Sequence, residues 1–126
     1  MASASAAAPI YIGGDFTTYN GTTYNGLARL DASGNLDATF LPGGSGFVTG
    51  GTVEVDSVAV DFSDRVVIGG FFTQIKGTTR VGVARILSTG ALDSAGFVPN
   101  TLTASVGSPQ VFKVLVDDSG NVIIAG

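Results

Sequence analysis

The stretch IYIGGDFTTYNGTT, residues 10–23, recurs as VVIGGFFTQIKGTT, residues 66–79. Ile12 returns as Ile68, so the sequence repeats with a period of 56 residues, and the matches continue well beyond these two stretches. A third copy begins with VIIAG at residues 122–126. Self-similarity of this length is typical of proteins that stack one supersecondary unit on the next. The repeat therefore predicts the architecture before any single motif is considered.

The strand pattern within one repeat predicts which unit is stacked. The segment VEVDSVAVDF, residues 53–62, alternates apolar and polar residues as a half-buried strand does. VVIGGFF, residues 66–72, is an apolar run too short for a helix, and VARIL, residues 83–87, predicts a third strand. A turn then opens the short segment ALDSAGF, residues 91–97. Three or four antiparallel strands in a repeat of this length predict one blade of a β-propeller, whose faces are covered by neighbouring blades.

The composition also favours an all-β fold. The chain has 126 residues, enough for one small domain, and contains 19 glycines but no cysteine, histidine or tryptophan. Glutamate occurs once and lysine twice, so the residues that form good helix surfaces are nearly absent. The absence of cysteine excludes a disulfide framework and zinc sites built from thiolates.

The period divides the chain into a leader and repeats. We expect the small, weakly polar residues 1–9 to form an N-terminal leader or tether outside the repeated region, residues 10–126. The expected units are repeat one at 10–65, repeat two at 66–121, and the start of a third at 122–126.

Two blades cannot close a propeller, because rings contain about four to eight blades. The predicted fold is therefore a set of blades whose ring is incomplete within one chain. The missing blades could come from other copies, for example three chains that exchange strands into a six-bladed ring, or from a longer polypeptide. The finish at Gly126, in the middle of a repeat, favours the longer polypeptide.

The repeat resembles a known family. IYIGGDFTTYNG, followed by GLARLDASGNLDATF, resembles the delta-60 repeat, a β-propeller repeat of bacterial surface proteins and phage structural proteins. The first copy carries every position of that pattern: Gly13, Gly14, Phe16, Ala28, Arg29, Leu30, Asp31, Gly34, Leu36, Asp37 and Phe40. The second copy loses the turn aspartate at Leu87 and has an extra residue before Phe97. The resemblance implies a propeller with a surface or assembly role and implies no catalytic residues.

The loop TTYNGTTYNG offers candidate contact residues. It is a tandem pentapeptide that places Tyr19, Asn20, Tyr24 and Asn25 at equivalent positions. Aromatic faces beside amide groups can stack on sugars or anchor a protein partner. Alternatively, Asn-Gly forms ordinary turns and the tyrosines pack on a neighbouring blade, and this structural interpretation is the one we favour.

Two Arg–Asp pairs recur with the period. Arg29 and Asp37 return as Arg85 and Asp93 in otherwise sparsely charged surroundings. They could line a ring of charge, but we expect ion pairs that fix packing within or between blades.

Aspartate-rich turns and paired glycines also have a functional and a structural interpretation. DASGN at 31–35 and DDSGN at 117–121 could suggest calcium ligands, yet they lack the further carboxylates that a calcium loop needs, so we expect hairpin turns. The Gly-Gly pairs lack the residues that follow in a phosphate-binding loop, and they are expected to allow a bulge or a close backbone approach.

Composition argues against most biochemical activities. Without histidine or cysteine the usual nucleophile–base pairs cannot form, and no two acidic residues sit where the repeat would bring them together, so we expect neither an enzyme nor a cofactor. The net charge is −4 with scattered acidic residues, which predicts no nucleic-acid binding. No apolar run approaches the length of a membrane span, so no membrane insertion is expected.

These observations predict a non-catalytic structural or interaction module of a virion or cell-surface assembly, extracellular or on the virion surface. Its expected partners are other protein chains, through self-association or a larger assembly. The alternative is a carbohydrate-binding propeller lectin that uses the loop tyrosines and asparagines. A hydrolase is the third class, and it would require an activity that disappears with one specific aspartate substitution.

Overall fold

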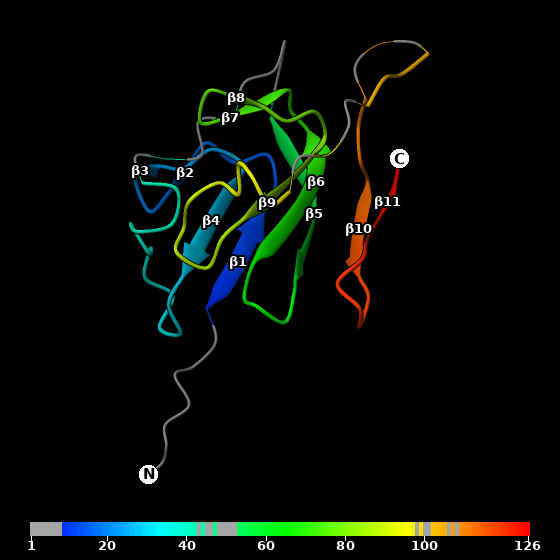
Figure 1. Ribbon diagram of the computed structural model, residues 1–126. Coiled ribbons are helices and arrows are strands. Elements are labelled where there is room, and N and C mark those ends of the chain that lie inside the picture. Colours follow the sequence, from blue (N-terminus) through cyan, green and yellow to red (C-terminus); the bar gives the residue numbers. More distant parts are fainter. Residues whose placement is uncertain are drawn as a thin grey trace.

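The computed structural model describes residues 9–42, 44, 47, 53–97, 99, 102–105, 107 and 109–126. The expected leader, residues 1–9, lies outside the described residues except for Pro9. The described residues form strands and turns without any helix, and the main strands make three small sheets that follow one another without closing a ring (Figure 1). The prediction of an all-β fold with an incomplete ring is confirmed.

All strand pairs are antiparallel. The first sheet pairs β1 (Ile10–Gly13) with β4 (Leu27–Leu30), the second has the order β5 (Glu54–Val60), β6 (Val66–Phe71), β9 (Val83–Ile86), and the third pairs β10 (Lys113–Val116) with β11 (Val122–Ala125). Two small hairpins lie in the loops, β2 (Thr18–Tyr19) with β3 (Thr22–Thr23) and β7 (Gln74–Ile75) with β8 (Thr78–Thr79).

The three sheets are copies of one unit at different stages of completeness. We call residues 56 positions apart counterparts, so that β6 is the counterpart of β1 and of β11, and β10 is the counterpart of β5. The second sheet has all three strands, and an isolated bridge between Ile86 and Leu92 adds the beginning of a fourth. The same bridge joins Leu30 and Leu36 in the first sheet, whose β1 pairs with β4 alone among the described strands.

The hairpin in each loop is built by the turn that its glycine allows. Asn20 and Gly21 have φ of 48° and 82°, and their counterparts Lys76 and Gly77 have φ of 51° and 78°. Two consecutive residues with positive φ form the type I′ turn, whose twist matches that of the flanking strands. The sequence predicted this segment only as a loop, because each strand of the hairpin is two residues long.

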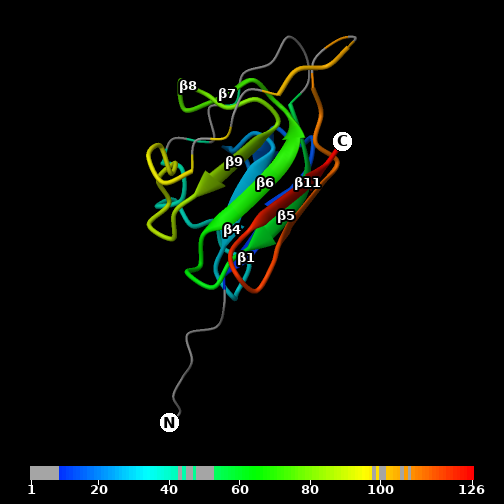
Figure 2. The same cartoon turned by 45° about the vertical axis from the view of Figure 1, so that its right-hand side comes forward.

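Apolar side chains fill the spaces between successive sheets. β5 packs against β1, and β10 packs against β5 and β6, as two views of the stack show (Figures 1 and 2). The larger core lies between the first and second sheets and consists of Leu27, Phe40, Leu41, Phe47, Val53, Val55, Val66, Ile68, Phe72, Ile75, Ala84 and Ile86. The smaller core lies between the second and third sheets and consists of Val67, Val83, Val111 and Val114.

The first glycine of each Gly-Gly pair lets the next sheet approach closely. A Cβ atom at Gly13 would lie 2.7 Å from a Cγ atom of Val55, and one at Gly69 would lie 2.7 Å from a Cγ atom of Val111. Real Cβ atoms do not come so close, so any larger residue would push the sheets apart. The predicted close approach is therefore made between sheets.

The second glycine accommodates a bulge within its own sheet. The pairing of β5 with β6 shifts between Val55 and Ser57, opposite Gly69 and Gly70. A Cβ atom at Gly70 would overlap the carbonyl oxygen of Glu54 on the bulged strand. Because that obstacle is backbone, it cannot turn away as a flexible side chain would.

We expect Gly70→Ala to destabilise the fold by about 1–3 kcal/mol, because one added methyl group would overlap the β5 backbone. Gly14→Ala is the matched control, since a Cβ there would meet only the ring of Phe16, at 3.5 Å. Chemical denaturation of both variants measures the difference. Equal stabilities would contradict the role assigned to Gly70.

Candidate functional site

The junction between successive sheets is made by a repeated set of backbone contacts. The N–H group of Val55 donates to the carbonyl of Gly14 at 3.0 Å, and that of Val111 donates to the carbonyl of Gly70 at 3.1 Å. At the second junction the N–H of Val114 also donates to the hydroxyl of Ser57 at 3.1 Å. The chain therefore contains two junctions between successive units, and both are made by the same backbone hydrogen bond.

A buried arginine ties the first unit to the turn of the second. The Nε of Arg29 lies 2.8 Å from the Oδ2 of Asp37, and its Nη1 donates to the carbonyl of Ser88 at 2.8 Å. Its guanidinium also stacks over the ring of Phe40, 4.8 Å from the centroid. Hydrogen bonds from Thr39 lower the pKa of the Asp37 carboxyl, and the hydrogen bond and charge of Arg29 lower it further.

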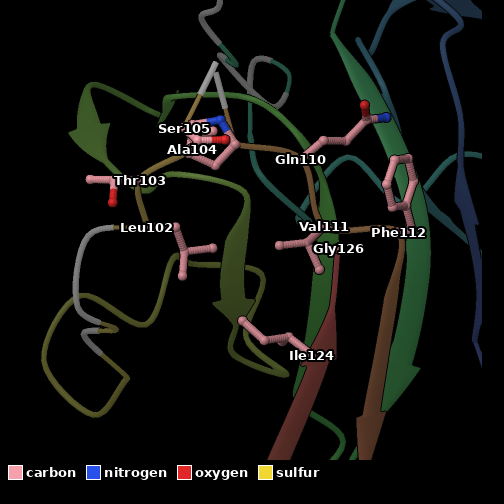
Figure 3. A pocket seen from close by; sticks show the side chains of 10 residues that line it. Leu102, Thr103, Ala104, Ser105, Gln110, Val111, Phe112, Ile124 and Gly126 are labelled. Carbon is pink, nitrogen blue, oxygen red and sulfur yellow. The ribbon is translucent and has the colours of Figure 1, made fainter. Parts of the chain in front are cut away.

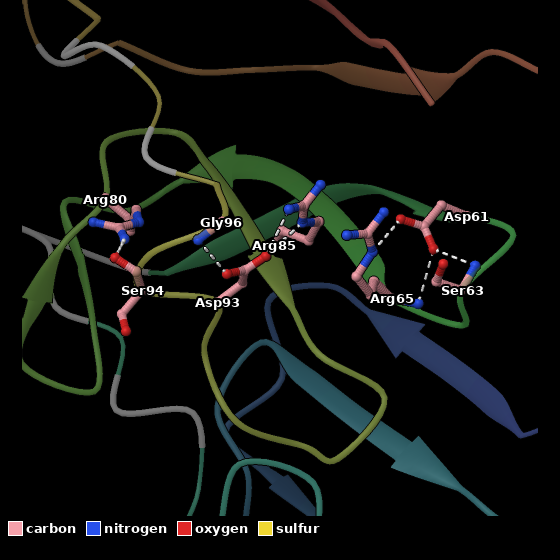
Figure 4. Close-up of polar contacts among 8 residues, drawn as sticks. All are labelled: Asp61, Ser63, Arg65, Arg80, Arg85, Asp93, Ser94 and Gly96. Carbon is pink, nitrogen blue, oxygen red and sulfur yellow. Dashed lines mark hydrogen bonds and ion pairs between the residues drawn. The ribbon is translucent and has the colours of Figure 1, made fainter. Parts of the chain in front are cut away.

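The counterpart pair lies in the second unit (Figure 4). The Nη2 of Arg85 lies 2.6 Å from the Oδ2 of Asp93, and the guanidinium lies 5.0 Å from the centroid of the Phe97 ring. Burial disfavours the charged Asp93 carboxylate, but hydrogen bonds from Arg85 and from the Gly96 N–H outweigh that effect and lower its pKa. Both pairs are ion pairs within one unit, and each is capped by an aromatic ring.

A third buried arginine was not singled out from the sequence. Arg80 is the counterpart of Tyr24, and it donates to the carbonyl of Thr79. It also donates to the carbonyl of Ser94 (Figure 4). Its Nε is a buried nitrogen without a hydrogen-bond partner among the described residues. No signal in the sequence distinguishes this arginine from an exposed one, because its neighbours Thr79 and Val81 belong to no apolar pattern.

The two loop tyrosines use their hydroxyl groups inside the protein. Tyr24 is 3% exposed and donates to the carbonyl of Phe40 at 3.1 Å. Burial raises the pKa of the Tyr24 hydroxyl, and the charge of Asp37 raises it further. Tyr19 is half-buried and donates to the carbonyl of Gly34 at 2.7 Å. The structure thus separates the two rings, and only that of Tyr19 keeps substantial exposed surface.

The loop asparagines also differ in exposure. Asn20 is exposed at the tip of the β2–β3 turn, whereas Asn25 is half-buried. The counterpart tip residue, Lys76, reaches back to the first unit and donates to the carbonyl of Pro42 at 2.7 Å. Ligand contact by this loop stays a prediction, and of its four candidate residues Asn20 is exposed, Tyr19 and Asn25 are half-buried, and Tyr24 is buried.

The aspartate carboxylates of the two DxSGN turns accept hydrogen bonds from the backbone of their own turns. The Oδ1 of Asp31 accepts hydrogen bonds from the N–H groups of Ser33 and Asn35, at 2.8 and 2.9 Å. The Oδ1 of Asp117 accepts from Ser119 and Asn121 in the same way, at 2.9 and 2.8 Å. Within the described part of the chain, no group of three or more acidic or histidine side chains is placed to hold a metal ion.

The outer face of the third sheet, which we define by Leu115 and Ile123, is apolar and uncovered. The two residues pair across β10 and β11, on the face opposite Val114, which packs on the second sheet. Leu115 is 50% exposed and Ile123 is 52% exposed. Their counterparts in the second sheet are Ala59, which is half-buried, and Val67, which is fully buried under the third sheet.

A pocket of about 480 Å³ opens beside the third sheet (Figure 3). The side chain of Leu102 points into it from a loop, toward Val111 and Ile124 on the other side. Gln110 and Gly126 complete this end of the lining. The pocket is therefore lined by both apolar and polar residues and adjoins the strand pair β10–β11.

The Gly-Gly pair is altered in the third unit, where it reads Ala125 and Gly126. Gly126 keeps its function, because a Cβ there would overlap the carbonyl of Gln110 as one at Gly70 would overlap its own bulged strand. Ala125 occupies the position that glycine holds at both existing junctions. A further unit could not approach β11 as closely as the third sheet approaches β6.

Comparison with known proteins agrees with this architecture. The model of a family described as "Domain of unknown function (DUF5122) beta-propeller" matches residues 10–40 and 63–95. These segments make up half of the chain and cover the same part of both repeats, so the chain belongs to this β-propeller family. The finding confirms a β-propeller repeat family. No curated protein and no solved structure matches the chain.

Among the residues that the structure describes, none forms a helix long and apolar enough to cross a membrane.

We expect Asp93→Asn to lower the free energy of unfolding by about 3–5 kcal/mol, because it leaves the buried Arg85 guanidinium without its counter-charge. Asp118→Asn, in an exposed turn, is the control. Since the folded state lowers the Asp93 pKa, its contribution is present above the ordinary aspartate pKa of about 3.9 and is lost as the pH falls through the folded value. Denaturation of both proteins from pH 7 to pH 2 should show the difference between them shrink with acidification, and a constant difference would contradict the assignment.

Proposed function

We propose that this chain is a non-catalytic structural module that joins protein chains into an assembly on a virion or cell surface. The β-propeller fold itself indicates a protein-interaction module. The surface or virion setting, extracellular in either case, is supported by the resemblance of both repeats to the delta-60 repeat.

One observation carries the proposal, the outer face of the third sheet. In the covered second sheet the counterparts are less exposed, Val67 being buried and Ala59 half-buried, whereas Leu115 and Ile123 stay half exposed. Further large apolar side chains are exposed on or next to this strand pair, namely Phe112 and Ile124, and on or after the neighbouring strand β5, namely Val60 and Phe62. Contiguous exposed apolar surface of this kind marks protein-interaction sites.

The absence of catalysis is part of the proposal. The arginines and aspartates of the two Arg–Asp pairs form ion pairs with each other, and the turn aspartates accept hydrogen bonds from backbone N–H groups. These contacts stabilise the fold. Together with a sequence that lacks histidine and cysteine, this favours a module that works through surfaces and needs no cofactor.

Replacing both Leu115 and Ile123 by serine tests the proposal. We expect the wild-type chain to associate with rising concentration in sedimentation velocity, and the double variant to stay monomeric with nearly unchanged stability, because both side chains are half exposed. Phe62→Ser, which removes an exposed apolar side chain outside β10 and β11, is the control. A wild-type chain that stays monomeric, or a variant that associates equally well, would overturn the proposal for this surface.

The alternative, a carbohydrate-binding propeller lectin, has one observation in its favour. The partly exposed ring of Tyr19 lies next to the exposed amide of Asn20 on the same hairpin. A glycan array probed with the wild-type chain and with Tyr19→Ala should show binding that the substitution reduces at least tenfold. An array without binding by the wild-type chain would rule this alternative out for the glycans tested.

A further inference from the structure

We propose that β10 of one copy pairs with β1 of a second copy in place of its own β11, and that Phe16 of the second copy then enters the pocket beside β10. This inference rests on the proposed function, because it names a second copy of the chain as the partner. Three observations lead to it: a free strand edge, a glycine on that edge, and the pocket.

The free edge belongs to β1. Among the described strands β1 pairs with β4 alone, whereas its counterpart β6 lies between β5 and β9. The side chains reflect the difference, since Ile10 is 44% exposed and its counterpart Val66 is fully buried. An unpaired edge presents a row of backbone donors and acceptors to another strand. In the second sheet β5 pairs with the corresponding edge of β6. The counterpart of β5 is β10, so β10 is a strand that can pair with this edge of β1.

The glycine is Gly14. Its counterparts Gly70 and Gly126 must be glycine, because a Cβ there would overlap the carbonyl of the bulged strand alongside. At Gly14 a Cβ would meet only the ring of Phe16, at 3.5 Å, and the backbone does not have positive φ. Within the described chain nothing therefore requires glycine at this position. A bulged strand such as β10, paired with β1, would require it.

The pocket corresponds to a space that an aromatic ring fills elsewhere in the chain. In the second unit Phe72 follows Gly70 by two residues, is 1% exposed and packs on Phe47 with ring centroids 4.9 Å apart. It shares the larger core with Val55 and Ile68.

The pocket beside the third sheet is lined by the counterparts of these residues. Val111 and Ile124 are the counterparts of Val55 and Ile68. The side chain of Leu102 lies beside Gly82, as the side chain of Phe47 lies beside Gly26. A phenyl ring placed two residues after a glycine that pairs with β10 would therefore fit against Val111 and Leu102, as Phe72 fits in its own unit.

A single exchange satisfies all three features. With the register of the other sheets, Val116 would pair with Ile10 of the second copy and Val114 with Ile12. Ile12 and Gly14 would then take the places of Ile124 and Gly126 in the lining of the pocket, and Phe16, two residues after Gly14, would lie against Val111 and Leu102 as Phe72 lies in its own unit. β1 also brings β4 and the following β5 with it, so the outer face at Leu115 becomes covered.

Cysteine pairs distinguish the exchange from its alternative, because the natural chain has no cysteine. Ile10→Cys with Val116→Cys should form a disulfide between copies on mild oxidation, since paired strand residues lie within disulfide range. The matched pair Val116→Cys with Val122→Cys joins residues that face each other within one chain. It should lock β11 on β10, give no disulfide between copies and abolish association. Val116→Cys alone controls for random coupling.

Gly14→Ala supplies a test without cysteines. It should leave the monomer as stable as the wild type, because the added methyl group has room, and weaken self-association by about tenfold or more, because that methyl would overlap the backbone of β10. Phe16→Ala should weaken association as well. Sedimentation velocity over a concentration series measures both, and denaturation confirms that the variants fold.

Two outcomes overturn the exchange. If the locked pair or Gly14→Ala associates as the wild type does, copies meet by another route, and the proposed interaction function survives only if the Leu115 and Ile123 substitutions still abolish association. If the Ile10 and Val116 cysteines form no disulfide between copies at any concentration, β10 does not pair with β1 of a second copy.

Discussion

The fold depends on the distance at which one sheet can lie against the next. The N–H groups of Val55 and Val111 reach the carbonyl oxygens of Gly14 and Gly70 only because no side chain stands between the strands. Both cores are closed by this approach, since the valines that donate these bonds also contribute their side chains to the apolar clusters. Hydrogen bonding and apolar burial therefore act at the same residues, which makes each junction cooperative.

The two repeats show which positions the fold constrains. The Arg–Asp pair and its aromatic ring keep the same geometry in both units. Tyr24, by contrast, is replaced at its counterpart by Arg80, yet both side chains are buried and both donate to carbonyl groups. A tandem pentapeptide that suggests a ligand-binding loop is thus partly a packing device. At this position the two units share a buried side chain that donates a hydrogen bond, although the residue itself differs.

Much of the architecture could be predicted from the period, because a strand that recurs every 56 residues fixes the units and their order. The close approach at the Gly-Gly pairs was also within reach of the sequence. The β2–β3 and β7–β8 hairpins were not, since their strands are too short to show alternation. An incomplete ring predicts that outer blade faces expose apolar surface, but the residues of this face could not be told from covered ones. Leu115 and Ile123 follow the same alternation as their covered counterparts, and sequence alone does not report which faces find a neighbour.

The methyl group of Ala125 has a consequence for solubility. Identical units that stack face to face have no natural end, and such heterologous contacts produce open fibres unless a ring closes. With β11 in place, Ala125 stands where both internal junctions need glycine, so a folded copy cannot add to this face with the packing used inside the chain. One carbon atom thus makes β11 different from its counterparts and disfavours open-ended stacking of copies on the half-exposed apolar face.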